Sequence, residues 1–289
     1  MEILQLKYFK DAAQTENFSK TAQKFRVPTS AVSQSIRRLE KEMGTALFAR
    51  TSNRIRLNEE GKLLYQAVCQ MGRTLADTKR LFAEGGGELT GEIRLQIACN
   101  RRIVSDAIRG FSQAHPQVRF LIRHDVSAEE EADLVISDDP GLKERYTGTP
   151  LLTEGIGVAF SKEHWLSCRK QIKVQDLAGE RFVTMQPGSR LQELTRNLCV
   201  QAGFYPQIAI ECDDPYYIRK YIGMGLGIGF IPLFSWRGQL PEGLICIPLD
   251  GVTRTTCAWW DANRYMPRAV RVFLELLRGL CEAESGEGK

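Results

Sequence analysis

The sequence predicts a two-domain protein: a helical amino-terminal domain with a winged helix-turn-helix and a long linker helix, followed by an α/β domain. Three observations lead to this prediction. A chain of 289 residues is long enough for about two domains. Residues 1–86 carry 15 Lys and Arg against nine Asp and Glu, whereas the remainder carries 24 against 26. Apolar residues recur at helical spacing in the first domain, and strand and helix patterns alternate after the glycines at 85–87.

The composition limits the class of protein. With 43% apolar and 26% charged residues, the chain is typical of a globular protein. The sequence has no run of ~18 apolar residues, so we expect no membrane helix. Its amino-terminal segment has no apolar signal-peptide core, so we expect a cytoplasmic protein and not a secreted one. The eight cysteines contain no C-x-x-C pair, which favours reduced thiols and argues against a zinc finger. Residues 21–56 hold eight basic and two acidic residues, a bias that suits nucleic acid but also a solvated basic face.

Short connections separate three expected helices, at about 4–13, 19–25 and 29–43. Asn17 and Ser19 offer a stop and a new helix cap, and Gly44 ends the third helix. The second and third helices have the lengths and tight connection of a helix-turn-helix, whose second helix enters the DNA major groove. Five polar side chains of this helix lie away from its apolar stripe: Ser30, Ser33, Gln34, Arg37 and Arg38. Thr29 joins them because the amino-terminal end of such a helix enters the groove first. Gln and Arg can pair with base edges and Ser with bases or phosphates, so these side chains are the candidate DNA contacts, Arg38 more as a phosphate contact.

Residues 47–57 alternate polar and apolar side chains around a Ser-Asn turn, which predicts a small hairpin. Two strands after a helix-turn-helix form a wing, and an arginine at its tip can enter the minor groove. Arg50 and Arg54 fit that role, although a generic basic turn explains the same pattern.

A long helix is expected from Asn58, which can cap it, to about Ala83. Its apolar residues repeat at heptad spacing: Leu64, Val68, Met71, Leu75 and Phe82. We interpret them as a dimerisation seam, because a small winged domain has little surface to bury a helix of this length. Packing against its own domain is the alternative.

Residues 8–61 resemble the DNA-binding domain of the LysR-type transcriptional regulators. The matching residues are Phe9, Asn17, Phe18, Ser19, Ala22, Ala31, Val32, Ser33, Ile36, Leu39, Glu40, Gly44, Leu47, Phe48, Arg50, Leu57 and Gly61. The resemblance implies double-stranded DNA as a partner. Thr29 and Ser30 depart from the Gln-Pro or Gln-Ser that is usual in the family, and Pro28 replaces a common Ser.

The second domain shows strand patterns at 93–98, 118–123, 134–137, 155–160, 182–185, 207–212, 228–231 and 258–261, with helices at 104–114, 189–202, 215–224 and 269–282. This alternation predicts an α/β fold with a largely parallel sheet. The segments 176–179, 202–206 and 225–232 resemble the effector domain of the same family, which has two lobes like those of periplasmic solute-binding proteins.

The resemblance implies a domain division in which the winged helix-turn-helix spans 1–58, the linker helix and hinge 59–91, and the effector domain 92–289. Lobe I would hold about 92–155 and 263–289, and lobe II about 156–262. Residues 124–133 replace a full helix of the family with one or two turns. Because that helix often joins the dimer contact, both a homodimer and a homotetramer stay open.

Ligands of open α/β sheets bind where strands end and helices begin, and helix N-termini attract anions. The candidate effector residues at such junctions are Cys99, Asn100, Arg101, Gln186, Ser189, Cys212 and Asp213. We expect a small molecule between the lobes, and an anionic one held by Asn100, Arg101 and Ser189 with nearby backbone amides. Ordinary capping and turn chemistry is the alternative for each residue. Redox sensing through Cys99, Cys199 or Cys212 is a weaker hypothesis, because Ser189 and Arg190 stand where the peroxide-sensing branch of the family needs a reactive cysteine.

Catalytic and metal-binding motifs are lacking. The chain has no H-E-x-x-H, G-x-S-x-G or P-loop motif, and the glycines at 223–229 do not match G-x-G-x-x-G. The three histidines lie far apart in sequence, so we expect no metal, no cofactor and no catalytic residue. The sequence therefore predicts a sequence-specific DNA-binding transcriptional regulator, controlled by a small-molecule effector, rather than an enzyme. The alternative is a solute-binding or enzymatic α/β protein with an incidental helical amino-terminal domain.

Overall fold

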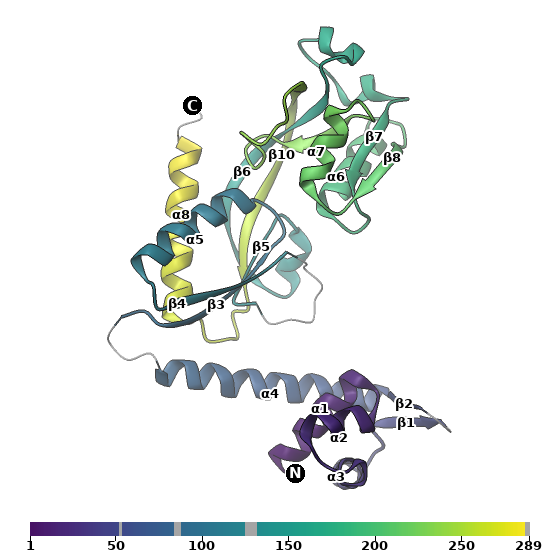
Figure 1. The fold of residues 1–289 in the computed structure, drawn as a ribbon, viewed down its shortest axis with the longest axis vertical. Helices are drawn as coiled ribbons and strands as arrows, with labels where there is room; N and C mark the ends of the chain where they lie inside the picture. Colours follow the sequence, from purple (N-terminus) through teal and green to yellow (C-terminus); the bar gives the residue numbers. More distant parts are fainter. Residues whose placement is uncertain (52–53, 84–87, 125–131, 287–289) are drawn as a thin grey trace. The chain divides into compact units, whose positions relative to one another are not determined.

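The computed structural model describes residues 1–51, 54–83, 88–124 and 132–286. The chain divides into two compact units, Met1–Ala83 and Glu84–Lys289 (Figure 1). The predicted hinge at 85–87 lies outside the described residues, as does most of the shortened segment at 124–133. Among the helices that the structure describes, none combines the length and apolar character needed to cross a lipid bilayer.

The amino-terminal unit is a three-helix domain with a two-stranded hairpin and a long final helix. Its elements are α1 (Ile3–Thr15), α2 (Phe18–Phe25), α3 (Thr29–Met43), β1 (Phe48–Thr51), β2 (Arg54–Leu57) and α4 (Glu59–Ala83). The side chain of Asn17 caps α2 by accepting from the backbone N–H groups of Ser19 and Lys20 at 2.9 and 3.1 Å. Gly44 closes α3 at φ +71°, a left-handed conformation that favours glycine.

One apolar face of each short helix forms the core of this unit. Phe9 of α1 and Val32, Ile36 and Leu39 of α3 are fully buried, in a cluster that also includes Val68 of α4. Complete burial of such side chains stabilises a fold by about 1.5–3 kcal/mol each. The spacing of 32, 36 and 39 places all three on one side of α3, so the opposite side faces solvent.

The start of α4 lies tightly against the hairpin. Asn58 caps the helix by accepting from the backbone N–H of Gly61 at 2.8 Å. A Cβ at position 61 would lie 2.2 Å from the carbonyl oxygen of Leu47, a distance that no side chain tolerates. Glycine is therefore required at this contact.

The second unit contains a six-stranded sheet in the order β4-β3-β5-β10-β6-β9 and a two-stranded sheet, β7-β8. The strands are β3 (Gly91–Ile97), β4 (Val118–Arg123), β5 (Leu134–Ser137), β6 (Thr147–Ser161), β7 (Arg181–Met185), β8 (Gln207–Cys212), β9 (Gly229–Pro232) and β10 (Leu244–Trp260). The α-helices are α5 (Arg101–Ala114), α6 (Arg190–Gln201), α7 (Pro215–Gly223) and α8 (Arg268–Gly286).

The prediction of a largely parallel sheet is wrong for the larger sheet. β3 pairs in parallel with β4 and β5, but β10 pairs antiparallel with β5 and β6, and β6 antiparallel with β9. The physical reason is that β6 and β10 are far longer than the short segments predicted, and they run side by side in opposite directions. Prolines and glycines such as Pro150, Gly155 and Gly157 interrupt the alternating pattern by which strands are recognised.

The two long strands connect two lobes with separate cores (Figure 1). Leu151 and Leu152 of β6 belong to a cluster with α5, α8, β3 and β5, whereas Ile156 and Val158 belong to a cluster with β7 and β9. Glu154 lies between these two groups. Each lobe therefore has its own hydrophobic core, and β6 and β10 pass from one core to the other.

Candidate functional site

The exposed face of α3 carries the predicted DNA contacts. Thr29, Ser30, Gln34, Arg37 and Arg38 are exposed, and Ser33 is half-buried. None of these six side chains has a hydrogen-bond or ion-pair partner within the described part of the chain. Pro28 supplies no side-chain cap at the start of α3, so the first backbone N–H groups of the helix are not satisfied by a capping side chain. A helix face with these properties can offer side chains to base edges and its positive end to phosphates.

The predicted wing is present as the hairpin of β1 and β2, which pair antiparallel from Phe48↔Leu57 to Thr51↔Arg54. Residues 52–53 and the side chains of Arg50 and Arg54 lie outside the described residues. Their proposed minor-groove contact stays a prediction.

The predicted seam on α4 divides into two parts. Leu64 and Val68 pack in the core of the amino-terminal unit, as the alternative interpretation expected. Met71, Leu75 and Phe82 are instead 38%, 50% and 81% exposed. Of the five predicted seam residues, only the three in the carboxyl-terminal part of the helix are thus exposed for a partner to cover.

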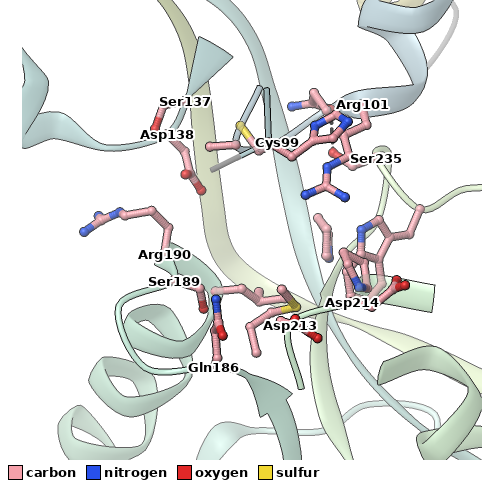
Figure 2. Close-up of a pocket in the computed structure, with 18 of the residues that line it drawn as sticks. Cys99, Arg101, Ser137, Asp138, Gln186, Ser189, Arg190, Asp213, Asp214 and Ser235 are labelled. Carbon is pink, nitrogen blue, oxygen red and sulfur yellow. Dashed lines mark hydrogen bonds between the residues drawn. The ribbon is translucent and has the colours of Figure 1, made fainter. Parts of the chain in front are cut away.

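A cleft of about 650 Å³ lies in the second unit where α5, α6 and α7 begin. Figure 2 shows Cys99, Arg101, Ser137 and Asp138 on one side, opposite Gln186, Ser189, Asp213 and Asp214. Ser189 and Asp214 cap α6 and α7, whereas Asn100, in a left-handed conformation at φ 54°, gives α5 no side-chain cap. Three helix N-termini therefore line one cleft, and their dipoles favour a negative charge there.

A buried polar network lies at one end of the cleft, where the two long strands cross between the lobes. Glu154 of β6 is paired in register with Arg254 of β10, whose Nε and Nη2 atoms lie 2.9 and 2.8 Å from Glu154 Oε1. The second carboxylate oxygen accepts from the backbone N–H groups of Phe234 and Ser235 at 3.0 and 2.7 Å. Arg254 also reaches Asp138 at 3.3 Å. Every charge of the network is thus hydrogen-bonded, as buried charges require.

The structure changes the role expected of Asn100. Its amide nitrogen donates to Thr256 Oγ1 at 2.5 Å, and its amide oxygen lies 2.5 Å from Ser235 Oγ. Asn100 is buried, and both ends of its amide are engaged in this network. Its side chain therefore holds the start of α5 in place more than it offers groups to a ligand.

Six of the seven predicted effector residues line the cleft, which leaves out Cys212. Ser189 Oγ accepts from Gln192 N at 3.2 Å, so its hydroxyl hydrogen stays available to a ligand. Cys99 is buried against the network, and burial raises the pKa of its thiol to about 12. Burial likewise raises the pKa of Cys199 to about 12. Both thiols are protonated at neutral pH, which argues against redox sensing by either residue.

Several residues of the cleft escape prediction from the sequence. They are Ser137, Asp138, Arg190, Asp214, Arg219, Ser235, Trp236 and Arg254. Of these, Asp214 and Arg190 directly adjoin predicted residues, so the junction rule could have included them. Arg219 and Trp236 carry no such signal, because they meet only through the fold. Within the described ranges, no group of three or more His, Cys, Asp or Glu side chains is placed to hold a metal ion.

Two family models match this chain, one in each of its two units. Residues 3–62 match the family model described as the bacterial regulatory helix-turn-helix protein of the lysR family, and residues 86–282 match the LysR substrate binding domain. The transcriptional dual regulator GltC of Bacillus subtilis is 27% identical, with 96% of each chain covered. The regulator XapR of Escherichia coli is 28% identical over 81% of this chain and 85% of its own.

Solved structures share the fold over nearly the whole chain. A full-length OxyR variant from Pseudomonas aeruginosa superposes with a TM-score of 0.70 at 19% identity, over 96% of this chain and 95% of its own. CbnR, a LysR family transcriptional regulator, superposes with a TM-score of 0.67 at 18% identity, over 97% and 99% of the two chains. Full-length CbnR in complex with its target DNA gives 0.65 at 19% identity, over 97% and 100%.

Proposed function

The chain belongs to the LysR family of DNA-binding transcriptional regulators with an effector-binding domain, and on this premise we propose which residues contact DNA and which hold the effector. Thr29, Ser30, Ser33, Gln34 and Arg37 of α3 read base edges in the major groove, and Arg38 contacts a phosphate. The observation that carries this assignment is the exposed face of α3, whose polar side chains have no partner in the described part of the chain. Arg50 and Arg54 of the hairpin reach the minor groove beside it.

We propose that the regulator is a homo-oligomer joined through the exposed half of α4. Met71, Leu75 and Phe82 provide a seam that a second copy of the helix can cover. Paired α3 helices then occupy two half-sites of double-stranded DNA. Leu75→Glu places a charge in this seam and should lower the oligomeric state measured by analytical ultracentrifugation. Gln66→Glu, at an exposed position of the same helix, should leave the oligomeric state unchanged.

We propose that a small-molecule effector binds in the cleft between the lobes. Gln186, Ser189 and Arg101 face the cleft, and the N-termini of α5, α6 and α7 favour an anionic ligand. The ligand contacts both lobes, so it favours the arrangement in which they fit it together and shifts the population of DNA-bound states. We infer that the cleft binds without catalysis, since Glu154 beside it is saturated with hydrogen bonds and the thiol of Cys99, which lines it, is protonated. The target being chromosomal DNA, we place its action in the cytoplasm.

A mobility-shift titration tests the assignment. Full-length protein is titrated against the DNA upstream of its own gene and against random DNA of equal length. Specific binding should be about 10³-fold or more tighter and should weaken steeply with salt. Equal affinity for both DNAs would refute sequence-specific recognition.

A further inference from the structure

Arg219 is a buried arginine beside the cleft whose charge has no hydrogen-bonded partner in the described part of the chain. It lies on α7 in the wall of the cleft and is only 7% exposed. Its Nε atom is buried without a hydrogen-bond partner, and its guanidinium has no hydrogen bond or ion pair within the described part of the chain. The contact that holds it is a stacking contact, in which Cζ lies 4.8 Å from the centroid of the Trp236 ring.

The other arginines of the cleft are already engaged or exposed. Arg254 is held by Glu154 and Asp138, and Arg190 by Glu193 and Asp139. Arg102 lies 3.5 Å from Glu284 and 3.9 Å from Asp106. Arg101 is exposed to solvent. The Nε atoms of Arg102 and Arg190 are also buried without a hydrogen-bond partner, but a carboxylate holds each of these two side chains. In the part of the chain that the structure describes, Arg219 is thus the buried arginine of the cleft that has neither an ion pair nor a hydrogen bond.

The charge of Arg219 is poorly compensated by the protein. Burial lowers the pKa of its guanidinium, and the nearby negative charge of Asp214 opposes this effect only in part. Asp214 forms no ion pair with Arg219 in the described part of the chain, and its Oδ1 accepts from the backbone N–H of Tyr216 at 2.8 Å. A buried cation without a hydrogen-bonded partner is costly to the fold. Such a cost is expected where a ligand supplies the missing partner.

We propose that the effector carries a carboxylate, and that Arg219, stacked on Trp236, binds it inside the cleft. This inference rests on the proposed function of the cleft as the effector site. A guanidinium matches the two oxygens of a carboxylate with two parallel N–H donors. Asp213 and Asp214 are exposed on the same wall, and their charges disfavour a phosphate dianion more than a carboxylate monoanion.

The test uses full-length protein and a defined set of probes. The acids are acetate, succinate, glutarate, benzoate and phenylacetate, each compared with its primary amide and with inorganic phosphate. Thermal shift identifies binding and isothermal titration calorimetry gives Kd. The variants are Arg219→Met, Arg219→Lys and the matched control Lys220→Met, which removes an exposed cation from the next position of α7.

At least one acid should bind the wild type, and its amide should not. Arg219→Met should weaken that acid at least about 30-fold, because a buried charge pair loses one partner. Arg219→Lys should lose less, and Lys220→Met should leave Kd unchanged. Without ligand, the Tm of Arg219→Met should equal or exceed that of the wild type, since an uncompensated charge is removed.

Four results would overturn the proposal: no acid binds, amides or phosphate bind as well as the acids, Arg219→Met binds the acid normally, or its Tm falls sharply without ligand. The same samples are titrated with the upstream DNA. Specific DNA binding together with one of these results rejects the carboxylate site alone. Loss of DNA specificity in the wild type rejects the proposed function itself.

Discussion

Replacing Glu154 by Gln should destabilise the effector unit more than any surface substitution of the same kind. Both carboxylate oxygens accept from donors: one from Arg254 and the other from two backbone N–H groups. An amide carries an NH₂ group on one side, so in either orientation the substituted side chain would place a donor against a donor. Breaking a buried charge pair costs about 3–5 kcal/mol, and a loss near the lower value, about 3 kcal/mol, is expected since Asp138 still holds Arg254.

Urea denaturation followed by tryptophan fluorescence measures this loss selectively. All four tryptophans lie in the second unit, at 165, 236, 259 and 260, so the signal reports the unit that contains Glu154. Glu211→Gln on the exposed face of β8 is the matched control, with an expected change within about 0.5 kcal/mol. A loss below about 1 kcal/mol for Glu154→Gln would refute the argument that this network holds the crossing strands together.

Three further predictions concern separate parts of the chain. Gly61→Ala should destabilise the amino-terminal unit by about 1–3 kcal/mol, because its Cβ would meet the Leu47 carbonyl. Gly72→Ala on the same helix has open space around it and should instead stabilise α4 by up to about 1 kcal/mol, and calorimetry measures both changes. Arg37→Ala should cost about 1–3 kcal/mol on specific DNA, and an equal loss on random DNA would reassign Arg37 to a phosphate. The thiol of Cys99, whose pKa is raised from 9.0 to about 12, should resist iodoacetamide at pH 8, while exposed Cys168 reacts. As the pH rises from 9 toward 12, the unfolded state loses this thiol's proton before the folded state does, so the free energy of unfolding that the thiol contributes should be lost. Rapid labelling of Cys99 in the folded protein would contradict its burial.

Local signals were sufficient where the chain itself marks the ends of an element. The third helix was predicted at its observed bounds, because Pro28 precedes it, Gly44 ends it and its apolar residues keep one spacing. The amino-terminal ends of α6 and α7 also lie at the predicted junctions. Ser189, a predicted residue, caps α6, and Asp214, the neighbour of predicted Asp213, caps α7. The face of α3 that points to solvent follows from the same spacing.

Long-range pairing could not be predicted in this way. β6 and β10 pair through segments about 100 residues apart, as in Glu154 with Arg254, and no local pattern marks that register. The same limit explains Asn100: its partners Ser235 and Thr256 lie 135 and 156 residues away in sequence. An asparagine at a helix start therefore suggested a ligand contact, although the fold uses its amide internally. Arg219 is the reverse case, since its burial against Trp236 shows only in three dimensions.

The ratio of the affinities for specific and for random DNA tests most directly the claim that this chain is a sequence-specific DNA-binding regulator. Fluorescence anisotropy of labelled upstream DNA, titrated with full-length protein at two or more salt concentrations and in competition with random DNA, gives that ratio. We predict specific binding at least about 10³-fold tighter than binding to random DNA, with a further change when an acid that binds the cleft is added. Equal affinity for the two DNAs at every salt concentration would contradict the account.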